Sequence, residues 1–183
     1  MMPYQPVWRD GKTVGSSRRD GEGRYGAIAG YLEGLDRFRA LDVGAHAGYF
    51  SLRLADEFEA DVTAVDDAEQ LRETAARPDV RGVTFIHKRI GADDLAGLGH
   101  FDVALCLSVL HHVPWWRQML TVLSAQSDIL FVEVPDPREV LPTAVAHFPE
   151  VSAVVGMLGG KKIYSCPGFD ERYSRPMYVI DRR

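Results

Sequence analysis

The chain has 183 residues, of which 46% are hydrophobic and 26% charged, and it carries a formal net charge of −5. These values are typical of one ordinary globular domain with a hydrophobic core, and they exclude a disordered or a fibrous protein. The charge is uneven, at +2 over residues 1–40, −10 over residues 41–160 and +3 over residues 161–183, and the acidic middle argues against a broad nucleic-acid-binding surface.

The first twenty residues are polar and basic, with several glycines and serines and the pair Arg18-Arg19. They predict either a solvated tail or a lid whose Arg18, Arg19 or Arg24 binds a carboxylate or phosphate, because guanidinium groups suit such anions. From Arg24 to Phe38 apolar residues recur at spacings of three and four, which predicts an amphipathic helix.

The stretch Leu41–Phe50 is the most informative part of the sequence. An apolar run ends at Gly44, a second glycine follows at Gly48, and a helical pattern begins at Tyr49. This predicts a strand, a tight glycine turn and a helix, as in nucleotide-binding α/β units, where the helix N-terminus offers free N–H groups. An ordinary strand-to-helix turn gives the same pattern, so the interpretation depends on the residues that come after the helix.

A second strand is predicted over residues 61–67, and it ends in two acids. Asp66 lies 18 residues after Gly48, close to the ~20 at which an acid binds ribose hydroxyls in a Rossmann-type unit. Asp67 suits the N-cap of a helix over residues 68–76. The two roles can coexist on neighbouring residues.

Strands and helices then alternate through the middle of the chain. We expect strands over residues 83–86, 101–107 and 129–134, and a helix over residues 115–125. The near-continuous apolar character of residues 101–107 indicates a strand buried on both faces. Regular alternation predicts a parallel sheet with right-handed crossovers.

The last third of the chain has a different pattern. A helix is expected somewhere within residues 138–158, followed by strands over residues 161–166 and 176–180. The short connection between these strands requires an antiparallel hairpin, because a parallel return needs a longer crossover. We therefore expect a parallel sheet that is finished by an antiparallel edge strand.

Residues 38–183 resemble the class I S-adenosylmethionine-dependent methyltransferases. The resemblance rests on four motifs in the family's order and spacing, at residues 41–50, 62–66, 101–112 and 129–134. It implies a Rossmann-like three-layer α/β/α sandwich whose mostly parallel seven-stranded sheet has the order 3-2-1-4-5-7-6 and an antiparallel last strand. It also implies a single domain over residues 1–183, in which residues 1–37 form an arm and helix over the active site of a core at residues 38–183.

The resemblance also implies a set of residues that bind S-adenosylmethionine. Asp42, Gly44 and Gly48 would surround the methionine moiety, and Asp66, with Asp67 beside it, would hold the ribose hydroxyls. Leu107 and Ser108 would line the cofactor near its sulfonium, mainly through backbone atoms.

Two positions depart from the family's pattern. His46 stands where a glycine is common, which leaves less room or places an imidazole beside the cofactor. Arg89, followed by Ile90, stands where many relatives have an acid that binds the adenine amine. We therefore expect the adenine to be held by backbone groups or by Asp93 or Asp94.

His111 and His112 lie where the family presents side chains to the methyl acceptor. A histidine with an ordinary pKa of ~6.5 can act as a base near neutral pH, although a His-His pair here can equally cap a turn or pack under the next helix. Trp115 and Trp116 would form an aromatic wall for the acceptor or belong to the core.

The favoured hypothesis is a methyltransferase that acts on a small molecule, with oxygen as a candidate acceptor atom and a carboxylate or phosphate recognised by the N-terminal arginines. Alternatives are an RNA or tRNA methyltransferase, and a cofactor-binding but catalytically silent partner module.

No apolar run approaches the length of a membrane span and the N-terminus has no signal-peptide core, so we expect a cytoplasmic protein without a membrane partner. With only Cys106 and Cys166 present, we expect no metal site.

Overall fold

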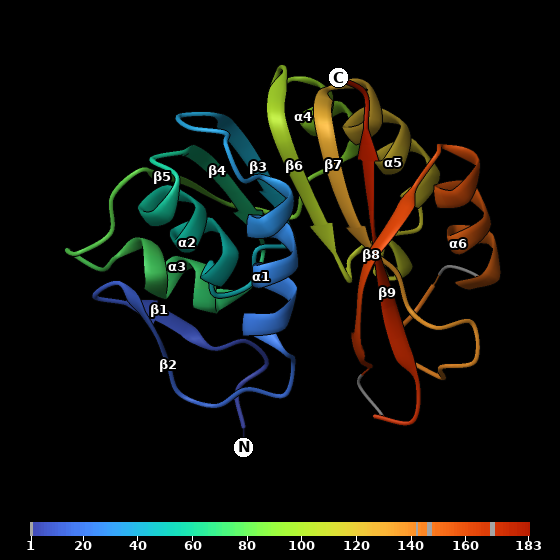
Figure 1. Cartoon of the computed structure of the whole chain (residues 1–183), viewed down its shortest axis with the longest axis horizontal. Coiled ribbons are helices and arrows are strands. Elements are labelled where there is room, and N and C mark those ends of the chain that lie inside the picture. The colour runs from blue at the N-terminus through green and yellow to red at the C-terminus, as the bar shows by residue number, and fades with distance from the viewer. Residues whose placement is uncertain (1, 142, 146–147, 169–170) are drawn as a thin grey trace. The chain divides into compact units, whose positions relative to one another are not determined.

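The computed structural model describes residues 2–141, 143–145, 148–168 and 171–183 (Figure 1). Contacts within the chain separate two compact units, Met1–Ile90 and Gly91–Arg183. Both units combine helices with strands, as the alternating sequence pattern predicted. In the part of the chain that the structure describes, none of the helices is long and apolar enough to cross a membrane.

The first unit contains three parallel strands and their helices. Its elements are β1 (Val7–Arg9), β2 (Lys12–Val14), α1 (Gly21–Tyr31), β3 (Arg39–Val43), α2 (Tyr49–Glu57), β4 (Asp61–Asp66), α3 (Glu69–Ala75) and β5 (Val83–His87). Strand β4 pairs in parallel with β3 and with β5. Helix α2 packs against all three strands and α3 packs against β5. The predicted strand, glycine turn and helix of residues 41–50 are therefore present.

The first residues form a docked hairpin where the sequence suggested a tail or a lid. Strands β1 and β2 pair antiparallel, and Trp8, the middle residue of β1, is buried. The indole Nε1 of Trp8 donates to Asp56 of α2 at 3.0 Å, and Arg77 donates to the carbonyl of Trp8 at 3.1 Å. These contacts attach the hairpin to α2 and to the segment that follows α3.

Helix α1 lies earlier in the chain than its apolar spacing predicted. It begins at Gly21 because the Asp20 side chain caps it by accepting from the Gly23 N–H at 2.8 Å. It ends at Tyr31, and Gly34 follows with a φ of 87°, a conformation that does not continue a helix.

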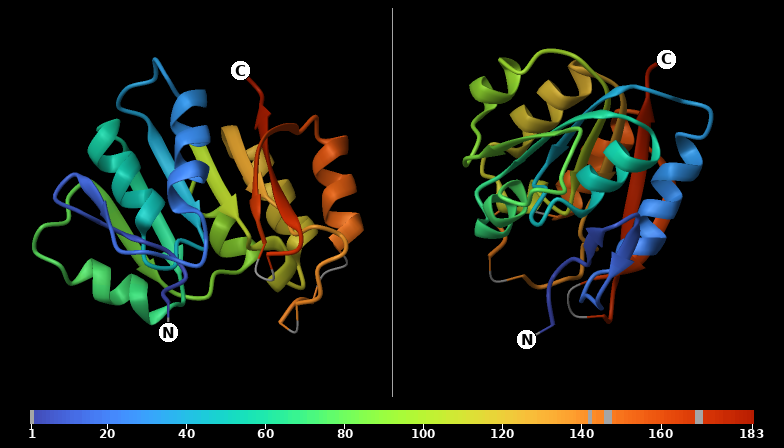
Figure 2. Two further views of the ribbon diagram at one scale, coloured as in Figure 1. Left: turned by 60° about the horizontal axis from the view of Figure 1, so that its bottom comes forward. Right: turned by 90° about the vertical axis from the view of Figure 1, so that its left-hand side faces the viewer.

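The second unit contains two parallel strands and a hairpin. Its elements are α4 (Ala92–Ala96), β6 (Phe101–Leu107), the 3₁₀ turn η1 (Leu110–His112), α5 (Trp116–Ala125), β7 (Ser127–Glu133), α6 (Phe148–Met157), β8 (Lys161–Pro167) and β9 (Ser174–Asp181). Strands β6 and β7 are parallel, and β9 is antiparallel to both β7 and β8. Figures 1 and 2 agree in showing α6 beside the β8–β9 hairpin.

The strand order is β5-β4-β3-β6-β7-β9-β8. Counted from β3 as the first strand, this is the predicted order 3-2-1-4-5-7-6, and the Rossmann-like fold class is confirmed. The antiparallel strand β9 lies between β7 and β8, so the sheet ends at β8 and not at the antiparallel strand itself.

Candidate functional site

The glycine loop between β3 and α2 is held close to the end of β4. The N–H groups of Gly44 and Ala45 donate to the carbonyl of Val65 at 2.8 and 3.2 Å. Gly48 is the N-cap of α2 with a φ of 74°, a left-handed conformation in which a larger residue is strained. Among the described residues no side chain caps α2, so its first N–H groups form a site suited to anionic or polar ligand atoms.

Asp66, at the end of β4, binds this loop directly. One carboxylate oxygen accepts from the His46 N–H and the other accepts from the Ala68 N–H, both at 2.8 Å. The side chain therefore joins the glycine loop to the start of α3. Each carboxylate oxygen can accept more than one hydrogen bond, so these contacts leave Asp66 able to bind a ligand hydroxyl.

Asp42 is a buried acid at the end of β3, with only 2% of its surface exposed. The Ser51 hydroxyl of α2 donates to its carboxylate at 2.6 Å. Burial raises the pKa of Asp42 to about 6, and the hydrogen bond from Ser51 opposes that rise. The carboxylate is thus ionised at neutral pH in a site of low polarity, where it attracts a cationic group strongly.

His46 lies in the loop with a φ of 53°, and its ring packs against the ring of Tyr4 with a centroid distance of 5.2 Å. Burial lowers the pKa of His46, while the nearby Asp66 charge opposes this shift. Its Nδ1 is buried and has no hydrogen-bond partner among the described residues. A buried nitrogen without a partner is costly, which favours a ligand or water that would bind it.

The N-terminal arginines occupy different environments. Arg19 and Arg24 are each only 1% exposed, whereas Arg18 is exposed. Arg24 donates to the carbonyl of Asp20 at 2.7 Å and its guanidinium lies 5.0 Å from the centre of the Phe50 ring. Two of the three arginines considered for binding an acceptor anion are therefore part of the packing of the first unit.

The residues that follow β5 are mostly exposed. Arg89 forms a surface ion pair with Asp67, with an N–O distance of 3.5 Å, while Ile90 is buried. Exposed pairs of this kind contribute at most ~1 kcal/mol to stability. In the second unit, Asp94 accepts from the Gly91 N–H at 3.0 Å at the start of α4, and Asp93 is exposed.

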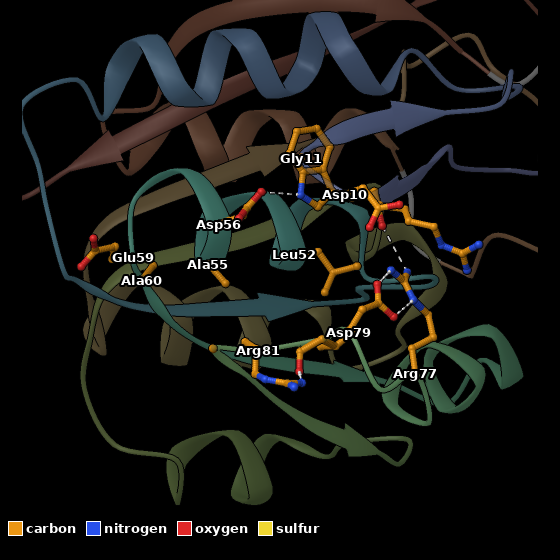
Figure 3. Close-up of a pocket in the computed structure, with 14 residues that line it drawn as sticks. Asp10, Gly11, Leu52, Ala55, Asp56, Glu59, Ala60, Arg77, Asp79 and Arg81 are labelled. Carbon is orange, nitrogen blue, oxygen red and sulfur yellow. Dashed lines mark hydrogen bonds and ion pairs between the residues drawn. The ribbon is translucent and has the colours of Figure 1, made fainter.

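A pocket of about 390 Å³ in the first unit lies away from the glycine loop (Figure 3). It is lined by residues of the β1–β2 hairpin, by the outer side of α2, and by Ala60 and Gly82, which precede β4 and β5. Arg77 and Asp79 form an ion pair in it. None of the predicted site residues lines this pocket, and it sits where strands begin, whereas ligands of open α/β sheets bind where strands end.

In the second unit, Ser108 follows β6 with a φ of 61°, which is unusual for a residue other than glycine. Its N–H donates to the Glu133 carbonyl at 3.1 Å and its hydroxyl donates to the Glu133 carboxylate at 2.9 Å. Glu133 ends the parallel neighbour β7 and is fully buried. These bonds hold Ser108 in a strained conformation of the kind that often marks a functional site.

The same hydroxyl accepts from Arg175 of β9 at 3.0 Å, and Arg175 forms an ion pair with Glu139 at 2.8 Å. Arg175 and Glu139 are both buried. A Cβ atom on Gly168 would overlap the Glu139 carboxylate, so a larger residue there would displace this carboxylate from its present position. The sequence analysis did not predict this network. The feature that could have indicated it is Glu133, an acidic residue directly after the apolar residues 129–132 of the same strand.

The two candidate catalytic histidines differ in exposure. His111 is fully buried, and its ring centroid lies 4.0 Å from that of the exposed His112. His112 Nδ1 lies 3.2 Å from the carbonyl of Thr143. Because a carbonyl only accepts, Nδ1 must carry the proton, and Nε2 of a neutral His112 then holds the lone pair.

Comparison with known proteins gives a consistent set of similarities. Residues 40–130 match the family profile described as a methyltransferase domain. The ubiquinone biosynthesis O-methyltransferase of Pectobacterium atrosepticum is 36% identical over 94 residues, which are 50% of this chain and 39% of that protein. The enzyme of the same description from Bordetella avium is 34% identical over 90 residues, 48% of this chain and 36% of that protein. The chain thus spans well under half the length of these relatives.

Solved structures share the fold at low sequence identity. WbdD, crystallised with a kinase inhibitor, has a TM-score of 0.75 and 21% identity over 99% of this chain, but the match covers only 45% of that chain. Magnesium protoporphyrin IX methyltransferase from Synechocystis, bound to S-adenosylhomocysteine, has a TM-score of 0.62 and 19% identity, covering 85% of this chain and 80% of that one.

Proposed function

Because the chain belongs to the class I S-adenosylmethionine-dependent methyltransferases, we propose that it transfers the methyl group of S-adenosylmethionine to an oxygen atom of a small-molecule acceptor. The observation that carries this proposal is the glycine loop after β3, which is tied to Asp66 and opens the uncapped helix α2. The similarity to two O-methyltransferases supports oxygen as the acceptor atom.

The residues around the loop fit the methionine part of this cofactor. The buried Asp42 supplies a negative charge that suits the α-ammonium group, and the first N–H groups of α2 suit the α-carboxylate. His46 Nδ1, buried without a partner among the described residues, is suited to a polar atom of the same ligand. The His46 side chain would then take part in cofactor binding, in place of the glycine that is common in the family.

The nucleoside part would lie beyond the ends of β4 and β5. Asp66 would accept hydrogen bonds from the ribose hydroxyls with Asp67 beside it, and Arg89 and Ile90 would flank the adenine. Leu107 and Ser108 would face the cofactor through backbone atoms, because the Ser108 side chain is bound by Glu133 and Arg175.

A methyl group on a sulfonium is already activated, so the enzyme has mainly to align the acceptor oxygen and remove its proton. His112 is better suited to this role than His111, since its ring is exposed and Thr143 holds the tautomer whose Nε2 can accept a proton. The acceptor hydroxyl would lose its proton to Nε2 as its oxygen bonds the methyl carbon and the carbon–sulfur bond breaks. The buried His111 would support the ring of His112.

Cofactor binding is tested by isothermal titration calorimetry of the whole chain with S-adenosylmethionine and, separately, with NAD. We expect saturable binding of S-adenosylmethionine only, weakened ~10-fold or more by Asp66→Ala, which corresponds to at least ~1.4 kcal/mol. Asp61→Ala, at the exposed start of the same strand, is the matched control and should bind as wild type does. If wild type does not bind S-adenosylmethionine, or if Asp66→Ala binds it as tightly as wild type does, the cofactor assignment is wrong.

Methyl transfer is tested by incubating the chain with a metabolite extract and S-adenosylmethionine that carries a ¹³C-labelled methyl group. We expect a product whose methyl carbon has the chemical shift of a methoxy group. His112→Ala should lower turnover ~100-fold, within the usual contribution of a general base, whereas His111→Gln should mainly change stability. A labelled N-methyl or C-methyl product would contradict transfer to oxygen. Unchanged turnover in His112→Ala would show that His112 is not the general base.

A further inference from the structure

A second pocket, of about 410 Å³, lies entirely within the second unit. Its walls come from the segment that follows β7, from α6 and from the β8–β9 hairpin. In Figures 1 and 2 these elements lie side by side. The segment after β7 begins where a parallel strand ends, which is the edge at which open α/β sheets bind ligands.

The pocket has a net positive charge. Arg138, Lys162 and Arg172 line it, against a single carboxylate, Asp136. The Arg138 side chain donates to both carboxylate oxygens of Asp136, from Nε and Nη2 at 2.9 Å each, and the Arg138 backbone N–H donates to one of them at 2.9 Å. These contacts lower the pKa of Asp136 to about 2, so the pair remains ionised and mutually neutralised. Counted over the residues that line the pocket, three cationic side chains and one carboxylate give a formal charge of +2 at neutral pH.

Hydroxyl groups supply the remaining polar surface. Ser152, Ser165, Ser174 and Tyr178 line the pocket. The hydroxyl of Ser152 is buried and has no hydrogen-bond partner among the described residues. Buried hydroxyls without partners are rare because the lost hydrogen bond with water is not replaced, so this one is suited to an acceptor atom that a ligand would bring.

The Tyr173 ring holds both guanidinium groups near the pocket. The guanidinium carbon of Arg138 lies 4.8 Å from the ring centre and that of Arg172 lies 5.7 Å from it. Cation–π contacts at these distances restrict the positions of long side chains that would otherwise be mobile. Restricted guanidinium groups lose less entropy when they bind an anion.

We propose that this pocket binds a small molecule through an oxyanion, a phosphate or a carboxylate, which Lys162 and Arg172 neutralise and to which Ser152 donates. The proposal goes beyond methyl transfer, since it concerns a site made of other residues and holds whether or not the chain transfers methyl groups. It assigns recognition of anions to residues of the second unit and not to the N-terminal arginines Arg19 and Arg24, which are buried.

The test is a titration of the whole chain, without S-adenosylmethionine, with inorganic phosphate, glucose 6-phosphate and succinate at constant ionic strength. Binding is followed by ¹H–¹⁵N chemical shifts. We expect saturable shifts at residues that line the pocket. The double variant Lys162→Gln/Arg172→Gln should bind the same probe at least ~10-fold more weakly than wild type does. Lys161→Gln is the matched control, because it removes a neighbouring lysine of β8 that does not line the pocket.

The three probes distinguish the possible anions. Binding of both phosphates without succinate supports a phosphate ligand, and equally strong binding of succinate supports a carboxylate. Ser152→Ala should weaken whichever probe binds. If none of the three binds saturably, or if the double variant binds as well as Lys161→Gln does, the site does not exist. Because the readout needs no methyl donor, failure here is separate from failure of the methyltransferase assignment.

Discussion

Asp42 is the next-to-last residue of β3 and Asp66 is the last residue of the neighbouring strand β4, yet their carboxylates lie in different surroundings. The spacing from Gly48 identified Asp66 as the residue that ends the second strand of the sheet, because such spacing follows from helix and strand lengths. The sequence did not predict that the two carboxylate oxygens of Asp66 accept from the N–H groups of two different loops. These contacts depend on backbone conformations such as the φ of 53° at His46. The burial of Asp42 beneath Ser51 likewise depends on how α2 packs.

The burial of Asp42 predicts a pH dependence of stability. Its pKa is raised to about 6 from 3.8, so the folded state resists ionisation and the stability that Asp42 contributes is lost as pH rises through this window. Asp42→Asn, which can still accept from Ser51, should therefore gain stability relative to wild type between about pH 4 and pH 6, by on the order of 3 kcal/mol. Urea unfolding at several pH values measures the difference.

The exposed Asp61→Asn serves as control for the Asp42 variant and should follow the wild-type pH dependence. A constant difference between Asp42→Asn and wild type over the whole range would contradict the burial argument. Above pH 6 the variant should be the more stable protein and the weaker binder of S-adenosylmethionine, because it lacks the charge that attracts the ammonium group.

At the scale of elements, the strands of the large sheet were predictable and the N-terminal hairpin was not. Strand β6 has its predicted bounds because seven mostly apolar residues suit only a strand buried on both faces. Strands β1 and β2 have three residues each, too few to show a period, and they are held by contacts with α2 that are distant in sequence. The Ser108–Arg175 contact joins residues 67 apart and was equally hidden.

The buried ion pair of Glu139 and Arg175 should be costly to break from one side. Glu139→Gln leaves a buried guanidinium without its counter-charge, and we expect a loss of ~3–5 kcal/mol in the free energy of unfolding. The double variant Glu139→Gln/Arg175→Met removes both charges and should lose less than either single variant. Denaturant unfolding of the four proteins gives the coupling; additive losses would show that the pair does not interact.

Two glycines at helices give a matched pair for a backbone prediction. Gly48 has a φ of 74°, so Gly48→Ala should destabilise the chain by ~1 kcal/mol or more and disturb the loop. Gly26 lies inside α1, where an added Cβ would meet open space, so Gly26→Ala should stabilise by ~0.5–1 kcal/mol. Thermal unfolding measures both, and shifts of the same sign would contradict the argument.

At the scale of the whole molecule, the strand order followed from the sequence because alternating strands and helices allow few right-handed arrangements and the final short connection forces an antiparallel pair. The positions of side chains in the two pockets did not follow. Arg138, Lys162 and Arg172 come from three separate segments, and no local pattern predicts that they line one pocket.

Cofactor binding should stabilise the chain as a whole. A ligand that binds only the folded state at 100 times its Kd adds ~2.7 kcal/mol, which for a chain of this size raises the Tm by ~5–10 °C. Scanning calorimetry with S-adenosylmethionine should show this rise, and the same concentration of NAD should not. A rise with NAD alone would contradict the cofactor assignment.

The attachment of the β1–β2 hairpin also bears on the speed of cofactor exchange. Trp8 and Arg77 fix the hairpin and the Arg19 N–H donates to the Tyr4 carbonyl, so the Tyr4 ring can turn away from His46 without movement of the hairpin. Rotation of a partly exposed side chain takes ps–ns, far less than the undocking of a folded element. The Tyr4 ring would thus impose no slow opening step, and the residence time of the bound molecule would be governed by its own contacts with the loop.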